Sequence, residues 1–184
     1  NFGEIINSHL QAVNFVRKYS EVPVSRRFRT VLTSSAGYPL DKTYYQTVKG
    51  MVGALGILEE GGQLIIASEC SEGLGSSDYA QAQERLMTRG PDQFLSDIKQ
   101  KDHALIDEWQ TQMQVKSMKH CRITLYTSQR YKLRGLAAVD FTDNVNKTIC
   151  DSVKCQDDPA VAIIPEGPYV IPFFVEDITS KYGK

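Results

Sequence analysis

"FRTVLTSSAGYPLDKTYYQTVKGM", residues 28–51, is the stretch that decides how this chain folds. Its first part, residues 28–37, is a β-branched run that closes in small residues and glycine, which is typical of a buried strand followed by a loop. A helical pattern follows over residues 41–58 and ends before the glycine pair at 61–62. A strand, a loop and a helix in this order form the repeating unit of α/β proteins.

The same alternation continues through the rest of the chain. Further strands are expected within residues 63–75, 121–128, 135–141 and 160–167, and further helices over residues 7–19, 78–99, 102–118 and 143–153. The helical region 78–99 should break at Gly90-Pro91. Because the strands are continuous apolar runs rather than in–out alternations, both faces of the sheet should be buried. The sequence therefore predicts one Rossmann-like, three-layer α/β domain over residues 1–184: a mostly parallel sheet flanked by helices on both faces.

Composition limits the possible partners. The 184 residues are 41% hydrophobic and 23% charged, as in ordinary globular proteins, and the formal net charge of −1 argues against a nucleic-acid partner. No apolar run approaches the roughly 20 residues that span a bilayer. The four cysteines form no CxxC pair, which favours reduced thiols in a cytoplasmic protein. Since the chain opens on Asn1 rather than Met, we expect it to be a piece of a longer protein.

Ligands of open α/β sheets bind beyond the carboxyl ends of the strands. Three loops are therefore candidates for a binding site: residues 34–41, 69–77 and 126–130. The glycine loop "EGLG" lacks the third glycine and the spacing of a dinucleotide fingerprint, so a nucleotide site has weak support.

The helix expected from Asp41 onward carries an unusual polar cluster near its start. Its core stripe should comprise Val48, Met51, Val52, Leu55 and Leu58, with Asp41 as the N-cap. Gln46 and Lys49 are neighbours three residues apart, and Tyr45 and Lys49 are neighbours four apart. A lysine, an amide and a phenol near a helix start could hold a small carboxylate or hydroxy acid. The alternative is a solvated lysine beside a surface glutamine.

Two further features of the sequence allow two interpretations each. Gly50 and Gly53 continue the face of Gln46 and Lys49, and each glycine costs about 1 kcal/mol inside a helix, so another backbone or a partner should approach closely there. Trp109, spaced as in a helix with Leu105 and Met113, could be a core residue or one wall of a cofactor site.

"SSAGYPLDKTYYQTVKGM" (34–51) resembles the signature of the carboxy-terminal domain of the lactate racemase family, the nickel-pincer-dependent 2-hydroxyacid racemases and epimerases. "ASECSEGLGS" (67–76) and "PEGPYVIP" (165–172) are similar to further segments of that domain. The tryptophan sixty residues beyond the lysine is matched by Trp109 in "IDEWQTQM". The resemblance covers nearly the whole chain.

The resemblance implies that residues 1–184 are the carboxy-terminal domain of a longer two-domain enzyme, whose active site lies in the cleft between the domains. The amino-terminal domain would hold the cofactor, a nickel-pincer nucleotide, together with the nickel-coordinating and acid/base histidines. A hydride would pass from C2 of a 2-hydroxy acid to the cofactor and back, through a transient 2-keto acid. This chain would then contain no catalytic residue and no metal ligand.

By the same resemblance, Gln46 and Lys49 would contact the substrate, Tyr45 would shape the pocket, and Trp109 would line it near the cofactor. The expected partners are the small 2-hydroxy acid and the protein's own amino-terminal domain, with neither nucleic acid nor membrane. Two other readings stay open: a small-ligand- or nucleotide-binding α/β module without catalysis, and a family member that lost activity and serves in assembly.

Overall fold

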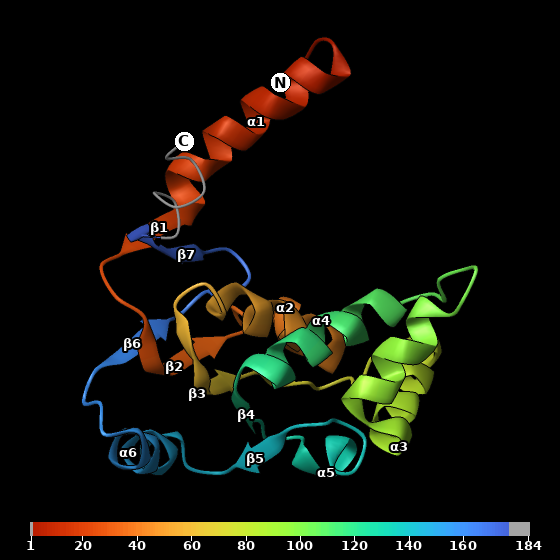
Figure 1. Cartoon of the computed structure of the whole chain (residues 1–184), viewed down its shortest axis with the longest axis vertical. Helices are drawn as coiled ribbons and strands as arrows, with labels where there is room; N and C mark the ends of the chain where they lie inside the picture. The colour runs from red at the N-terminus through yellow and green to blue at the C-terminus, as the bar shows by residue number, and fades with distance from the viewer. Residues whose placement is uncertain (1, 177–184) are drawn as a thin grey trace.

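The computed structural model describes residues 2–176, and its centre is a five-stranded parallel sheet (Figure 1). Across the sheet, the strands are β5 (Asp140–Thr142), β4 (Arg122–Tyr126), β3 (Leu58–Ala67), β2 (Phe28–Ser34) and β6 (Val161–Ile164). All four neighbouring pairs are parallel, which confirms the predicted mostly parallel sheet. The chain moves outward from β2 through β3 and β4 to β5, then returns to the opposite side of β2 as β6.

The central strand shows why continuous apolar runs form this sheet. Leu64, Ile65 and Ile66 in β3 are consecutive and fully buried, so side chains on both faces of the strand are covered. In the register of the sheet, Val31 of β2 lies between Leu64 of β3 and Ala162 of β6. The edge strands β5 and β6 are shorter, and Ile163 of β6 is exposed.

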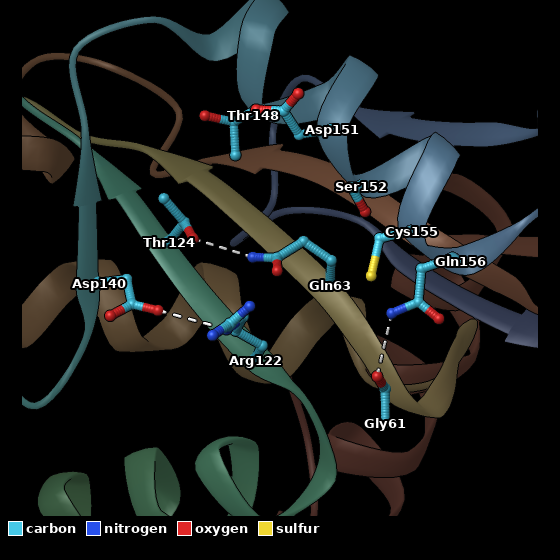
Figure 2. A pocket seen from close by; sticks show the side chains of 10 residues that line it. All are labelled: Gly61, Gln63, Arg122, Thr124, Asp140, Thr148, Asp151, Ser152, Cys155 and Gln156. Atoms are coloured by element: carbon cyan, nitrogen blue, oxygen red, sulfur yellow. Dashed lines mark hydrogen bonds and ion pairs between the residues drawn. The ribbon is translucent and has the colours of Figure 1, made fainter.

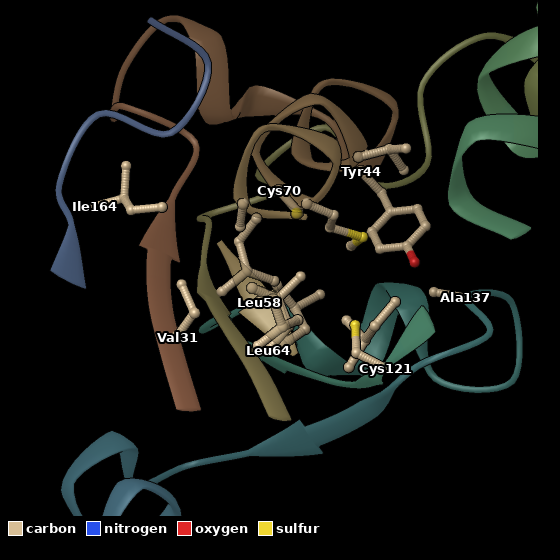
Figure 3. Close-up of a cluster of buried hydrophobic side chains, with 14 of the residues drawn as sticks. Val31, Tyr44, Leu58, Leu64, Cys70, Cys121, Ala137 and Ile164 are labelled. Carbon is tan, nitrogen blue, oxygen red and sulfur yellow. The ribbon is translucent and has the colours of Figure 1, made fainter. Parts of the chain in front are cut away.

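Helices cover both faces of the sheet, which confirms the three layers. On one side lie α2 (Tyr44–Ala54) and α4 (Glu108–His120), and on the other lies α6 (Val145–Gln156) (Figure 1). Figure 3 shows the apolar cluster that includes Tyr44 of α2 and Val31 and Leu64 of the sheet. On the opposite face, a 2.7 Å hydrogen bond between the hydroxyls of Thr30 and Ser152 joins β2 to α6.

The helical region after β3 breaks where the sequence predicts. In α3 (Ser77–Lys99), Gly90 adopts φ 77° and ψ 166°, and Pro91 follows it. The second half of α3 packs on α4 through the buried side chains of Phe94 and Val115.

Several element boundaries differ from the prediction. The helix expected from residue 41 begins at Tyr44, because Asp41 lies in a 3₁₀ turn, η1 (Leu40–Lys42), and Thr43 is the actual N-cap. Val48 and Met51 are fully buried as expected, but Leu58 opens β3 instead of closing the helix. The helix expected over 102–118 begins only at Glu108.

The strand expected over 135–141 was placed too early. A four-residue helix, α5 (Arg130–Leu133), ends before Gly135, whose φ of 77° turns the chain. Leu133 and Ala137 insert into the core from this turn, so their apolar character reflects burial rather than a strand. The strand β5 starts at Asp140, after the turn.

The ends of the described chain form a part of the fold that the prediction missed. A second, two-stranded parallel sheet pairs β1 (Glu21–Val24) with β7 (Ile171–Phe174). The expected amphipathic helix is present as α1 (Ile5–Ser20), but it projects away from the five-stranded sheet (Figure 1). Its apolar side chains are exposed, among them Ile6, Leu10, Phe15 and Val16.

Candidate functional site

The start of α2 is positioned by its N-cap and by its buried face. The hydroxyl of Thr43 accepts a hydrogen bond from the backbone N–H of Gln46, which satisfies one of the free donors at the helix start. Tyr44 and Val48 point into the core and are fully buried. Because side chains three or four residues apart share a helix face, Tyr45 and Lys49 share the outer face of α2, where Lys49 is exposed and Tyr45 half-buried.

The structure brings three of the four predicted site residues together. The ring of Tyr45 stands edge-on to Trp109, with centroids 6.1 Å apart and planes at 88°. The Nζ atom of Lys49 lies 5.6 Å from the centre of the Tyr45 ring, in cation–π range. Trp109 comes from the first turn of α4, and 51% of its surface is exposed, so it is not a core residue. Gln46 is half-buried on α2, one turn before Lys49.

Sequence reasoning missed the residues that hold Tyr45 in place. The amide of Gln110, itself buried, donates a 2.7 Å hydrogen bond to the backbone carbonyl of Tyr45, joining α4 to α2. Tyr79 of α3 packs edge-on against the Tyr45 ring at 5.1 Å. Burial, followed by the charge and the hydrogen bond of Asp107, raises the pKa of the Tyr45 phenol. The phenol is therefore neutral at neutral pH.

The two glycines of α2 lie against other backbone of this chain. A Cβ on Gly50 would stand 2.7 Å from the carbonyl oxygen of Ser34, and one on Gly53 would stand 2.8 Å from that of Gly167. The close approach of another backbone is therefore confirmed. That backbone belongs to the end of β2 and to the loop before β7, so of the two expected neighbours the glycines admit another backbone of this chain rather than a partner. The absence of a side chain at Gly50 and Gly53 lets α2 pack closely against this backbone.

The three loops singled out by topology do meet. Side chains and backbone from the carboxyl ends of β2, β3 and β4 surround a crevice of about 260 Å³, lined by Ser34, Gly37, Asp41, Ala67, Ser68, Glu69, Tyr126 and Thr127. Hydrogen bonds from Ser128 and Gln129 lower the pKa of Glu69, which keeps its carboxylate ionised. With Asp41 and Glu69 and no lysine or arginine in its lining, the crevice disfavours a phosphate or a carboxylate ligand.

A larger cavity of about 460 Å³ lies on the other side of the sheet, between α6 and strands β3 and β4 (Figure 2). Several of its polar groups pair with one another. The Gln63 amide donates to the Thr124 hydroxyl at 2.9 Å, and Arg122 pairs with Asp140 at 3.4 Å. This mutual pairing indicates a solvated groove rather than a site prepared for a ligand.

The remaining residues that could bind a metal ion or react as thiols form no second candidate site in the described part of the chain. Among residues 2–176, no group of three or more His, Cys, Asp or Glu side chains is placed to hold a metal ion. All four cysteines are free thiols, with Cys70 and Cys121 buried and Cys150 and Cys155 exposed. Within the described part of the chain, no helix is both long and apolar enough to cross a membrane.

Comparison with known proteins adds an independent line of evidence. A sequence model of the family described as "Lactate racemase C-terminal domain" matches residues 25–172. The lactate racemase of Thermoanaerobacterium thermosaccharolyticum is 27% identical over 185 residues, which cover 92% of this chain and 40% of that enzyme. The lactate racemase of Lactiplantibacillus plantarum is 32% identical over 77 residues, 42% of this chain and 18% of that enzyme. The chain thus spans about 40% of the length of the first of these relatives.

Solved structures agree with this match. The lactate racemase apoprotein from T. thermosaccharolyticum superposes with a TM-score of 0.78 at 25% identity, over 89% of this chain and 40% of that one. A Thermotoga maritima protein superposes with a TM-score of 0.56 at 12% identity, over 92% of this chain and 42% of that one, and shares the fold.

Proposed function

We propose that this chain, which belongs to the lactate racemase C-terminal domain family, forms the substrate-binding wall of a cleft in which a 2-hydroxy acid is racemised or epimerised. The observation that carries the proposal is the exposed Lys49 ammonium, held over the Tyr45 ring next to a half-exposed Trp109.

Lys49 is suited to bind a substrate carboxylate. Among residues 2–176 no carboxylate forms an ion pair with Lys49, so its charge is not neutralised within this part of the chain. The Tyr45 ring restrains the ammonium through its quadrupole while leaving the N–H donors available. A charge-assisted hydrogen bond of this kind contributes about 1.5–3 kcal/mol, and it also fixes the orientation of the substrate.

The neighbouring side chains complete the wall. Gln46, one helical turn from Lys49, would hydrogen-bond the substrate and set its orientation. The Tyr45 phenol, whose pKa is raised by burial and by Asp107, stays neutral and contributes its ring to the wall between Lys49 and Trp109. Trp109 offers a flat, half-exposed aromatic face that fits the planar ring of a pyridinium-type cofactor.

We infer that the cofactor is a nickel-pincer nucleotide held by an amino-terminal domain of the full-length protein. It supplies an acceptor for the hydride on C2 of the substrate. The residues of this chain bind the carboxylate, orient C2 and exclude water from the closed cleft.

A second domain would also explain the surface of α1. Exposed Ile6, Leu10 and Val16 give this helix an apolar surface that a folded neighbour would cover. We expect Leu10→Glu to leave the melting temperature of this chain alone nearly unchanged, because Leu10 is exposed there. In the full-length protein the same change should lower the melting temperature, and an unchanged value would argue against α1 as a domain contact.

The experiment that tests the proposed function uses the full-length, cofactor-loaded protein and a panel of D- and L-2-hydroxy acids deuterated at C2. Interconversion with deuterium retained in both enantiomers is the expected result, since a hydride returns to the carbon it left. Loss of deuterium to water would instead indicate deprotonation at C2. If no 2-hydroxy acid is interconverted and this chain binds a small ligand tightly, it is a binding module, the alternative that the carboxyl-end crevice would serve.

A further inference from the structure

Gln110 is a buried polar side chain whose hydrogen bond crosses from α4 to α2, the two helices that lie on one side of the sheet (Figure 1). Only 1% of its surface is exposed, although glutamine usually lies at protein surfaces. Its Nε2 atom donates a 2.7 Å hydrogen bond to the backbone carbonyl oxygen of Tyr45. Because a carbonyl oxygen can only accept, the contact requires a donor at the end of the side chain.

The carbonyl that Gln110 reaches belongs to the helical turn that carries Lys49. In an α-helix, each carbonyl accepts a hydrogen bond from the N–H four residues further on, so the Tyr45 carbonyl is also the helical acceptor for the backbone N–H of Lys49. A carbonyl oxygen has two lone pairs and can accept from both donors. The Gln110 amide therefore joins the first turn of α4 to the turn of α2 that presents Tyr45 and Lys49.

Trp109 precedes Gln110 in the same turn of α4 and is half-exposed. Its ring meets the Tyr45 ring edge-on, with centroids 6.1 Å apart and planes at 88°. Edge-on ring pairs are favourable over a range of centroid distances from about 4.5 to 7 Å, so this contact alone leaves Trp109 room to shift. The hydrogen bond of the neighbouring Gln110 restricts how far the first turn of α4 can slide or rotate over α2.

Other buried amides of the described chain do not reach α2. Gln83 of α3 donates a 2.8 Å hydrogen bond to Gln114 of α4, so this pair holds α3 against α4. Gln63 of β3 donates to Thr124 of β4 within the sheet. Each of these bonds joins parts of the scaffold, whereas the bond of Gln110 ends between the side chains of the proposed wall.

We propose that Gln110 is a positioning residue, which sets the place of Trp109 relative to Lys49 by joining α4 to α2. This inference rests on the proposed function, in which Lys49 binds the substrate carboxylate and Trp109 lines the pocket near the cofactor. Small displacements of groups that orient a substrate have large effects on rate. Loss of the Gln110 hydrogen bond should therefore slow the reaction, although Gln110 itself touches neither substrate nor cofactor.

The first test follows Trp109, the only tryptophan of the 184-residue chain, and needs no activity. Gln110→Met keeps a long, unbranched side chain with a similar helix propensity but removes the donor. Time-resolved fluorescence anisotropy of this chain measures how freely the indole moves on the picosecond-to-nanosecond timescale. We expect Gln110→Met to enlarge the sub-nanosecond component of the decay, because the first turn of α4 is no longer joined to the Tyr45 carbonyl.

Gln63→Met is the matched control, because Gln63 is a buried amide, 8% exposed, that donates a 2.9 Å hydrogen bond away from α2 and α4. It should lower the melting temperature, as Gln110→Met does, but leave the Trp109 decay unchanged. Gln110→Asn is a second variant: its amide ends one methylene short of the Tyr45 carbonyl, so it should enlarge the fast component as well. A wild-type decay in a folded Gln110 variant would overturn the proposal.

The second test is a double-mutant cycle in the full-length, cofactor-loaded protein. Gln110→Met and Trp109→Ala should each lower kcat/KM by about tenfold. If Gln110 acts through the position of Trp109, the double variant should lose little more than Trp109→Ala alone. Losses that multiply would overturn the proposal. If the wild-type protein racemises nothing, the proposed function fails, while the Trp109 decay still decides whether Gln110 holds Trp109 in place.

Discussion

The Nζ atom of Lys49 lies 5.6 Å from the centre of the Tyr45 ring, one helical turn back along α2. The ring restrains the ammonium without neutralising it, as a carboxylate would. A cation held in this way stays able to bind an anion that arrives from the solvent. Under the proposed function, this relationship accounts for the tyrosine and the lysine four residues apart near the start of α2.

Trp109 is the only tryptophan and is 51% exposed, so its fluorescence reports directly on the proposed wall. We expect acrylamide to quench the emission of this chain efficiently. Emission that resists acrylamide would show that Trp109 is buried and cannot line a cleft.

Gly50→Ala should destabilise the fold although alanine is the better helix former. The added Cβ would stand 2.7 Å from the Ser34 carbonyl oxygen, and such overpacking costs about 1–3 kcal/mol, while the helix propensity gains only about 1 kcal/mol. Thermal unfolding should show a melting temperature lower by roughly 2–4 °C per kcal/mol. Gln11→Ala on the exposed α1 is the control, and an unchanged or higher melting temperature for Gly50→Ala would contradict the close packing of α2.

Glu108→Gln should destabilise the protein at neutral pH by about 1.5–3 kcal/mol, because Arg85 and Lys101 lose a buried, charged hydrogen-bond partner. Burial acts to raise the pKa of Glu108, but hydrogen bonds from Lys101 and Arg85 outweigh it and hold the pKa below its ordinary value of 4.5. The stability that this carboxylate contributes is therefore present above pH 4.5 and is lost as the pH falls through the lowered pKa.

Urea unfolding at neutral and acid pH measures both effects of Glu108→Gln. The variant should lack the part of the acid dependence that Glu108 supplies, whereas Glu84→Gln, at an exposed position of α3, should keep it. Equal acid sensitivity in wild type and Glu108→Gln would contradict the role of the buried carboxylate.

The main sheet was predictable because each long strand can be recognised from its own run of apolar residues. Three consecutive buried residues, Leu64 to Ile66, can only belong to a strand covered on both faces or to a buried helix, and the flanking glycines decide between these. The small sheet was not predictable. "EVPV" and "IPFF" are four residues long, each contains a proline, and their pairing depends on a partner about 150 positions away.

The candidate site was predictable only where local spacing governs it. The neighbouring positions of Tyr45 and Lys49 follow from helix geometry, whereas Trp109 was selected by family resemblance. Asp107 and Glu108 were missed because nothing local marks an aspartate as left-handed or a glutamate as buried. Both properties arise from the way residues 101–108 fold back between α3 and α4.

The central claim is that Lys49 binds the substrate carboxylate, and the racemisation rate of Lys49→Ala in the full-length, cofactor-loaded protein tests it most directly. We expect a loss on the order of 100-fold or more, with unchanged melting temperature and nickel content, since charge and orientation are lost together. Lys49→Arg should not rescue fully, because its planar fork differs in shape from an ammonium. Gln46→Ala should have a milder effect, and Lys154→Ala, at an exposed position of α6, should have none. Near-normal turnover in Lys49→Ala would show that Lys49 is only a solvated helix residue and would contradict the account.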